Sequence, residues 1–359
     1  MVRMKITIRI QLFLKGKNSP TLLYDNGNYY HKTYKMNADK MRAIIYTKYG
    51  PPEVVRLTEI EKPVPKDNEV LIKIHAATVN RTDCGFRSAE YFIVRFFSGL
   101  IRPKNKTLGN EFAGEIEAVG KDVKLFRPGD KVFGYNDTKF GAHAEYMVMA
   151  ENGSITTMPE KITYEEAAPV IEGAHYALCD IRAAKIQSGQ KILINGATGA
   201  IGSAAVQIVK YLGAEVTAVC DTKNCDLVKS LGAKVVIDYT KEDFTKISQT
   251  FDVVFDAVGK SSFGKCKPLL RKGGIYMSTE LGYMSQNPFL ALITPLLGGK
   301  KVLFPIPTIS KEDVVFLKEL VENGNYKPLI DRSYSLEQIV DAYKYVETGQ
   351  KIGNVVINV

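Results

Sequence analysis

The sequence predicts an α/β protein in which a β-rich region precedes a doubly wound parallel sheet. From Met41 to about residue 150, short segments alternate apolar and polar residues, and Gly-Pro-Pro and Pro-Lys-Asp-Asn turns separate them, as in antiparallel strands. From Thr163 the apolar spacing becomes helical, and strands then alternate with helices. Such alternation indicates a parallel sheet with helices on both faces.

The segment 191–220, KILINGATGAIGSAAVQIVKYLGAEVTAVC, reads as a strand, a glycine-rich turn, a helix and a second strand. Glycines at such a turn let the backbone bend tightly and approach a pyrophosphate, and the helix N-terminus stabilises the phosphate charge. The chain is therefore predicted to bind a dinucleotide in a Rossmann domain. The residues expected at the phosphates are Gly196, Ala197, Thr198, Gly199, Ala200, Ile201 and Gly202.

Periodicity also predicts the remaining elements. We expect one helix over 165–186, one through 266–272, and two amphipathic helices over 313–324 and 335–349. The strand near residue 300 is expected at a sheet edge, because prolines cannot donate to a central ladder.

Composition and charge exclude several classes of function. The chain has 359 residues and a formal net charge of +9, but residues 1–40 alone hold eight Lys or Arg against two Asp, which leaves +3 for the rest. No basic face for nucleic acid is therefore expected. No apolar run approaches the roughly 20 residues that span a bilayer. Five widely spread cysteines suggest reduced thiols, as in the cytoplasm.

Residues 1–40 form a basic leader, for which three interpretations are open. It can be a disordered extension, an upstream start before Met36 or Met41, or a transit peptide. The first two are favoured, because serine is scarce and arginines are few.

From residue 41 onward the chain resembles the medium-chain dehydrogenase/reductase superfamily. The markers, besides the glycine turn, are PPEV at 51–54, LGNEFAG at 108–114 and RPGDKV at 127–132. The resemblance implies a GroES-like, partly open β-barrel catalytic domain formed by 41–165 and 309–359. It also implies a Rossmann domain over 166–308, with the active site in the cleft between the two.

The zinc site of that superfamily is altered in this sequence. Asn80 stands where zinc members carry a cysteine, and Asn110 replaces the histidine of their Gly-His-Glu triplet. Neutral amides are poor zinc ligands, so we expect no metal. Cys84 as a substitute ligand is disfavoured, since no histidine lies beside it. The chain therefore looks like the zinc-free quinone oxidoreductases and enone reductases, which implies hydride transfer to a quinone or an α,β-unsaturated carbonyl.

The resemblance suggests Asn80 and Tyr176 as catalytic residues. Asn80 would face the nicotinamide or the substrate carbonyl, although a loop-capping amide is the alternative. Tyr176 takes a position where relatives often have threonine near the nicotinamide ribose, and it is a possible proton donor; a packing role is equally open. His175 and His143 could also donate protons, but both are more often structural.

The end of the second Rossmann strand bears on the choice of cofactor. Asp221 fits the acid that binds the ribose of NAD, whereas a nearby cation fits the 2′-phosphate of NADP. In the zinc-free relatives, the pattern that binds the phosphate matches Cys220, Thr222, Lys223 and Tyr239. NADPH is therefore expected, with NADH as the alternative.

Further cofactor contacts follow from the resemblance. Val258, Gly259 and Ser278 end strands at the carboxyl edge of the sheet, where ligands of doubly wound folds bind. Lys351 and Asn354 match a family segment that returns to the cofactor, although Lys351 can equally be a solvated charge.

Three functions stay open from sequence. The first is NADPH-dependent, zinc-independent reduction of a small apolar quinone or enone by a homodimer paired through Rossmann edge strands. The second is an alcohol or aldehyde oxidoreductase. The third is a dinucleotide-binding module with vestigial catalysis that contacts a membrane or partner through the aromatic segment 86–102. A substrate loop is favoured over membrane contact for that segment.

Overall fold

The computed structural model describes residues 21–25, 28–32 and 39–359, which fall into a leader unit, 1–40, and a second unit, 41–359. In the leader, β1 (Thr21–Asp25) pairs antiparallel with β2 (Asn28–Lys32). The other leader residues, on which the three interpretations of this segment depend, lie outside the described residues.

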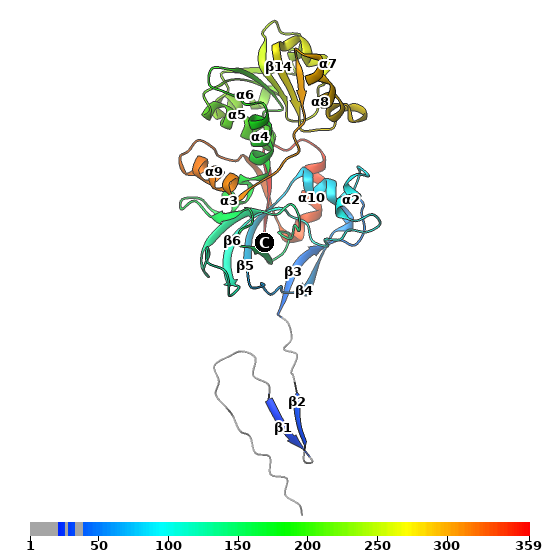
Figure 1. Ribbon diagram of the computed structural model, residues 1–359, viewed down its shortest axis with the longest axis vertical. Helices are drawn as coiled ribbons and strands as arrows, with labels where there is room; N and C mark the ends of the chain where they lie inside the picture. The colour runs from blue at the N-terminus through cyan, green and yellow to red at the C-terminus, as the bar shows by residue number, and fades with distance from the viewer. Residues whose placement is uncertain (1–20, 26–27, 33–38) are drawn as a thin grey trace, which may run out of the picture. The chain divides into compact units, whose positions relative to one another are not determined.

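The β-rich part of the second unit is a seven-stranded sheet in the order β16-β17-β5-β6-β7-β9, with β8 also paired to β5 (Figure 1). β5 is the longest strand, and its alternate apolar residues enter one buried cluster with those of β6 and β17. A separate pair, β3 and β4, lies beside this sheet. The strands are β3 (Lys40–Ile45), β4 (Arg56–Glu61), β5 (Glu69–Val79), β6 (Glu111–Val119), β7 (Lys131–Tyr135), β8 (Tyr146–Ala150), β9 (Ile155–Thr157), β16 (Ile330–Ser335) and β17 (Asn354–Asn358).

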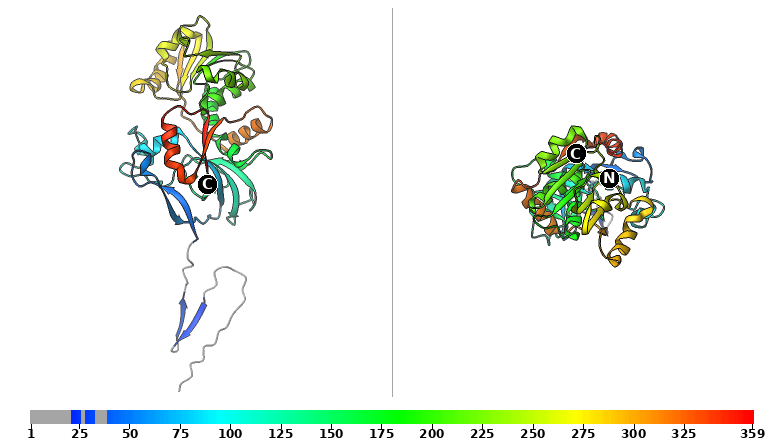
Figure 2. Two further views of the ribbon diagram at one scale, coloured as in Figure 1. Left: turned by 180° about the vertical axis from the view of Figure 1, so that it is seen from behind. Right: turned by 90° about the horizontal axis from the view of Figure 1, so that it is seen from above.

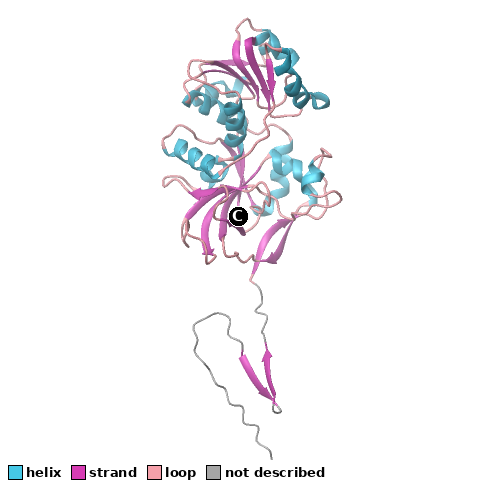
Figure 3. Cartoon of the chain, viewed as in Figure 1, coloured by secondary structure: helices cyan, strands magenta, loops and turns pink. Residues whose placement is uncertain are grey.

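The second sheet is the predicted parallel one, in the order β12-β11-β10-β13-β14-β15 (Figure 3). Successive residues of β10 face opposite sides, so Ile192 and Ile194 pack in the cluster that holds α4 and α5, while Leu193 packs with Phe263 and Leu290. Helices therefore cover both faces. The strands are β10 (Lys191–Asn195), β11 (Glu215–Cys220), β12 (Val235–Asp238), β13 (Phe251–Asp256), β14 (Leu270–Ser278) and β15 (Lys301–Leu303).

The helices connect and cover the two sheets. α10 packs against α1 and β5, on the β-rich part (Figure 2). The α-helices are α1 (Arg81–Ser88), α2 (Val94–Ser98), α3 (Tyr164–Ala167), α4 (Glu172–Ala183), α5 (Ala200–Tyr211), α6 (Cys225–Leu231), α7 (Phe263–Cys266), α8 (Gln286–Leu297), α9 (Lys311–Glu322) and α10 (Ile339–Glu347). Within the described ranges, no helix has the length and apolarity needed to cross a membrane.

Two helix predictions need correction, and one helix was not predicted. The helix predicted over 165–186 is divided into α3, a 3₁₀ turn and α4, because Pro169 (φ −84°, ψ 15°) leaves the helical conformation. The helix predicted through 266–272 ends earlier, and β14 begins at Leu270. α8, which contains Pro295, was not among the predicted elements.

Candidate active site

Asn80 ends β5 and begins α1. Its side-chain oxygen accepts a hydrogen bond from the Asp83 backbone N–H (2.9 Å), and the Asp83 carboxylate accepts one from the Asn80 N–H (3.2 Å). Asp83 also accepts from the backbone N–H of Gly109 (2.9 Å), next to Asn110. This reciprocal cap brings the two altered zinc-ligand positions together.

The two asparagines are hydrogen-bonded to each other. Asn80 Nδ2 donates to Asn110 Oδ1 (2.6 Å), and Asn110 Nδ2 donates to Glu172 Oε2 (3.1 Å) and to the Tyr135 hydroxyl (3.3 Å). Both side chains are buried. Because amides are weak zinc ligands and these two are engaged with each other, the residues present do not fit a zinc ion. Among the described residues, no three or more His, Cys, Asp or Glu side chains cluster as a metal site would require.

Glu172, at the start of α4, is the acid at the centre of this network. Its Oε1 accepts from the Thr82 hydroxyl (2.5 Å), which lies 3.3 Å from the Tyr176 hydroxyl. Burial raises the pKa of Glu172 to about 7. Tyr176 is half-buried, and burial and the nearby Glu172 raise the pKa of its phenol. The predicted catalytic residues Asn80 and Tyr176 are thus both linked to Glu172.

A second buried acid, Glu111, lies behind Glu172. It accepts hydrogen bonds from the backbone N–H groups of Ile171 and Glu172 and from the Thr78 hydroxyl. Burial first, and then the proximity of Glu172, raises the pKa of Glu111 to about 8. Sequence reasoning missed the roles of Glu172 and Glu111. The available signal for Glu172 was a single acid within the apolar run AAPVIEGAHYAL, and Glu111 lies in the LGNEFAG marker.

The glycine turn has the form that a pyrophosphate requires. Gly196 has φ +81°, and its backbone lies against the Val258 side chain. A Cβ on Gly202 would lie 2.1 Å from the Gly196 carbonyl oxygen, so no side chain fits there. A Cβ on Gly199 would lie 3.7 Å from the Gly196 carbonyl oxygen, an ordinary van der Waals contact, so a small side chain fits there. No side chain caps the N-terminus of α5, so its first N–H groups can bind phosphate.

The segment before β17 reaches this turn. The Gly353 N–H donates to the Thr198 carbonyl (2.7 Å). The ammonium of Lys351 donates to the Gly353 carbonyl, and burial, partly opposed by Glu172, lowers its pKa to about 8. Lys351 is thus half-buried, and its ammonium is engaged with the main chain beside the turn. The Asn354 side chain donates to the Leu329 carbonyl (2.9 Å), so its amide nitrogen is engaged within the protein.

The residues predicted at the 2′ end of the cofactor also lie together. Tyr239 N–H donates to the Cys220 carbonyl (3.0 Å), and the Thr222 hydroxyl donates to Asp238 (2.5 Å). The side chains of Lys223 and Tyr239 are exposed. Ser278 is buried at the end of β14, and Gly259 lies against the Glu280 side chain.

His143 and His175, the two histidines that could donate protons, are both buried. His143 is buried with Nε2 2.8 Å from the Thr78 carbonyl, and burial lowers its pKa to about 4. Burial also lowers the pKa of His175 to about 4. Both are therefore neutral at pH 7 and are poor proton sources.

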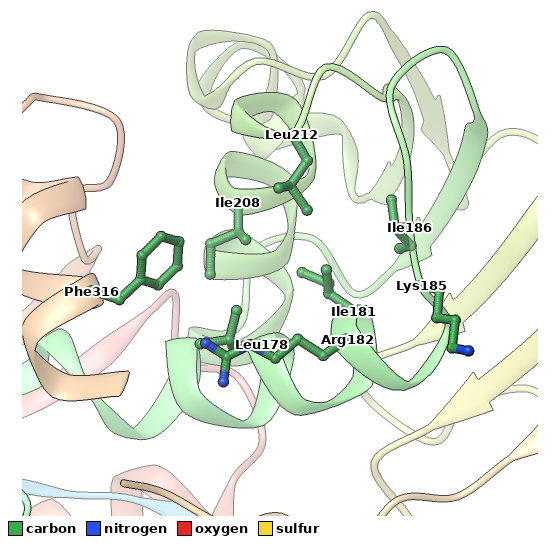
Figure 4. Close-up of a pocket in the computed structure, with 8 residues that line it drawn as sticks. All are labelled: Leu178, Ile181, Arg182, Lys185, Ile186, Ile208, Leu212 and Phe316. Carbon is green, nitrogen blue, oxygen red and sulfur yellow. The ribbon is translucent and has the colours of Figure 1, made fainter. Parts of the chain in front are cut away.

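A separate pocket on the surface contains no residue of this site (Figure 4). It is mainly apolar and lies among α4, α5 and α9. Its lining residues are Leu178, Ile181, Arg182, Lys185, Ile186, Ile208, Leu212 and Phe316.

A dinucleotide turn on a parallel sheet, joined to a β-rich domain with a buried polar network, defines a two-domain nicotinamide-dependent oxidoreductase. Two family models match, the alcohol dehydrogenase GroES-like domain over 66–160 and the zinc-binding dehydrogenase domain over 231–357. The chain belongs to the medium-chain dehydrogenase/reductase superfamily, in its quinone oxidoreductase-like branch.

Three similar proteins illustrate that membership. The 2-methylene-furan-3-one reductase of Solanum lycopersicum is 33% identical over 89% of this chain and 79% of its own length. The chloroplastic NADPH-dependent alkenal/one oxidoreductase of Arabidopsis thaliana is 29% identical over 89% and 79%. The structure of the quinone oxidoreductase from Coxiella burnetii has a TM-score of 0.79 at 28% identity and covers 89% of this chain and 100% of its own. The predicted family and fold class are confirmed.

Proposed function

We propose that this chain uses NADPH to reduce a small apolar quinone or α,β-unsaturated carbonyl, without zinc. The observation that carries the proposal is the hydrogen bond between Asn80 and Asn110, two amides at the zinc-ligand positions of an otherwise intact dinucleotide-binding enzyme. The printed names of the tomato, Arabidopsis and Coxiella relatives support the same substrate class.

The reduced nicotinamide supplies the hydride when it is bound. The chain itself must hold the acceptor and stabilise the charge that develops on its oxygen. Both polar atoms of the Asn80 amide are engaged within the protein, so its role is to position Asn110 and α1. We assign the half-buried Tyr176 hydroxyl as the group that donates a proton to the oxygen or carbon of the reduced substrate.

We propose NADPH over NADH because the exposed Lys223 side chain can bind the 2′-phosphate of NADPH. The Arabidopsis relative is also named NADPH-dependent. Asp221 argues for NADH, but its Oδ1 already accepts from the Asn224 amide (2.5 Å). The further residues that we assign to the cofactor are Gly196 to Gly202, Cys220, Thr222, Tyr239, Val258, Gly259, Ser278, Lys351 and the backbone at Asn354.

The proposed assembly is a homodimer paired through the Rossmann sheet. β15 is the edge strand of that sheet, as the prolines predicted. Beside it, α8 exposes Phe289, Leu292 and Leu296, which lie on one face of the helix at 62–85% exposure. Light scattering should give about twice the chain mass of 39.9 kDa, and Leu292→Asp should give the monomer. A wild-type monomer at micromolar concentration contradicts this assembly.

We propose that the protein is located in the cytoplasm, because the five cysteines of the described residues are free thiols, as is usual in a reducing compartment. The Arabidopsis relative is named chloroplastic, so residues 1–40 need a direct test. A fluorescent tag at the C-terminus of the full chain and of residues 41–359 should give the same cytoplasmic distribution. Organellar signal from the full chain alone contradicts the proposal.

The function is tested by following NADPH oxidation after exhaustive chelation. We expect turnover with enones and quinones and none with saturated aldehydes. Activity that disappears with the chelator and returns with zinc would overturn the zinc-independent chemistry. NADPH oxidation confined to saturated aldehydes, or NADP+ reduction with alcohols, would support the alcohol oxidoreductase instead.

A further inference from the structure

Three oxygen atoms form a continuous hydrogen-bonded path in the site. The Tyr176 hydroxyl lies 3.3 Å from Thr82 Oγ1, which lies 2.5 Å from Glu172 Oε1. A hydroxyl carries one proton, so the direction of the path depends on Glu172. An ionised Glu172 accepts from Thr82, which then accepts from Tyr176. A protonated Glu172 can instead donate to Thr82, which leaves the Thr82 proton for Tyr176 and the Tyr176 proton for the substrate. The path therefore connects a half-buried phenol to a buried carboxyl group.

We propose that Glu172 and Thr82 form a proton relay that resupplies Tyr176 during reduction. The inference rests on the proposed function and names the proton source for it. Tyr176 is the catalytic residue, because it would touch the substrate, while Thr82 and Glu172 act through it as positioning residues.

The relay consists of three proton transfers that follow the transfer of a hydride to the substrate. Once the double bond has accepted a hydride at its β-carbon, the product is an enolate anion. The Tyr176 O–H bond breaks and its proton moves to the enolate. The Thr82 proton moves to the Tyr176 oxygen, and the Glu172 proton moves to the Thr82 oxygen. The product is the neutral saturated carbonyl, and the Glu172 carboxylate regains a proton from water between turnovers.

Glu172 is able to hold this proton because of where it lies. Glu172 is only 5% exposed, and its burial favours the neutral form of the carboxyl group. The charged and titratable groups that face it are Asp83 on α1, Glu111 on β6, Tyr135 on β7, Tyr176 on α4 and Lys351 before β17. Asp83 favours the neutral form, whereas Lys351, Thr82 and Tyr135 favour the carboxylate, and the result is a pKa near neutrality.

The relay also lies beside the glycine turn. A Cβ on Gly173 would be 2.6 Å from the Ala200 carbonyl, so the start of α4 is in direct contact with the start of α5. Tyr176 follows Gly173 by one helical turn. The phenol is therefore on the part of α4 next to the proposed cofactor site.

The test compares Thr82→Val, which removes the hydroxyl at constant shape, with Thr82→Ser, which keeps it. We expect Thr82→Val to lower kcat for an enone about 10²-fold or more, within the range of general acid catalysis, and Thr82→Ser to restore most of it. NADPH binding, followed by fluorescence titration, should be unchanged in both. Thr245→Val is the matched control, because Thr245 also donates to a carboxylate (Asp243, 2.7 Å) but lies after β12.

The pH profile separates a relay from a purely structural hydrogen bond. Glu172 must be protonated to deliver a proton, so wild-type kcat should be highest below about pH 7 and fall above it. Glu172→Gln should lower kcat and abolish that inflection. An active wild type whose kcat and pH profile are unchanged by Thr82→Val overturns the relay alone. A wild type without turnover on any enone or quinone overturns the proposed function, and the relay with it.

Discussion

Asn80 and Asn110 are hydrogen-bonded to each other, Nδ2 to Oδ1 at 2.6 Å, at two positions where zinc members of the superfamily carry a cysteine and a histidine. Asn110 then donates to Glu172 and Tyr135. A polar network thus lies at the positions of the family's zinc ligands. Its members satisfy one another, which is the condition under which buried polar groups are tolerated.

Asn110→Ala should destabilise the protein, because it removes the hydrogen bond to Glu172 Oε2 and leaves Asn80 Nδ2 with only its 3.5 Å contact to Thr78 Oγ1. Each buried group left unpaired costs about 1–3 kcal/mol. Urea unfolding measures the change, and Asn325→Ala, on the exposed turn after α9, should stay within about 0.5 kcal/mol of wild type. A loss below 1 kcal/mol for Asn110→Ala would mean that water replaces the amide.

Gly199→Ala and Gly202→Ala should separate cofactor binding from folding. At position 199 the new Cβ meets no protein atom closer than 3.7 Å, so stability should be retained while NADPH affinity falls about tenfold. At position 202 the new Cβ would lie 2.1 Å from the Gly196 carbonyl oxygen, so both the stability of the protein and its NADPH affinity should fall. Thermal unfolding and fluorescence titration give the two readouts.

Gly264→Ala is the control for this pair, since a Cβ there has no neighbour within 4 Å and the glycine lies in α7, at a distance in sequence from the turn. Unchanged NADPH affinity in Gly199→Ala would contradict the assignment of this turn to the phosphates.

Local pattern was sufficient to predict the glycine turn and the elements that flank it. The turn, its flanking strands and the edge position of β15 all depend on residues within about 30 positions of one another, and each was confirmed. The acid network was not predicted, because Thr82 and Glu172 are 90 residues apart and meet only in the folded chain. A lone acid in an apolar helix gives no sign of its partner.

Prolines explain the helices that were misjudged. Pro169 lies within a helical pattern and interrupts it, whereas Pro295 lies within α8 without ending it. Helix propensity treats both residues alike, and tertiary packing decides which one is tolerated. The helix over 165–186 was thus drawn too long across Pro169, whereas α8 was not predicted at all.

Glu111→Gln should change how stability depends on pH. The folded chain holds the Glu111 proton up to about pH 8, whereas the unfolded chain loses it near pH 4.5. The folded state therefore binds more protons between these values, and the contribution of Glu111 to the free energy of unfolding falls as pH rises, by at most about 1.4 kcal/mol per pH unit. Glu111→Gln removes this slope.

The quantity to compare is the difference between variant and wild type at each pH, because His143 and His175 contribute an opposite slope between about pH 4 and 6.5. Glu160→Gln, at an exposed position, should leave the wild-type profile unchanged. A difference between Glu111→Gln and wild type that is constant from pH 5 to 8 would show that Glu111 is ionised throughout.

Lys223→Ala should distinguish the two nicotinamide cofactors. If Lys223 pairs with the 2′-phosphate, its loss removes one charge-assisted contact of about 1.5–3 kcal/mol, which is roughly a tenfold to hundredfold loss in NADPH affinity. NADH affinity should hardly change, because its ribose carries no phosphate. Asp221→Ser should strengthen NADPH binding by removing a like charge, although it also frees the Asn224 amide. Lys229→Ala, on α6 beside Asp226, is the charge-matched control. If Lys223→Ala and Asp221→Ser both weaken NADH binding more than NADPH binding, Asp221 is the ribose-binding acid and the enzyme uses NADH.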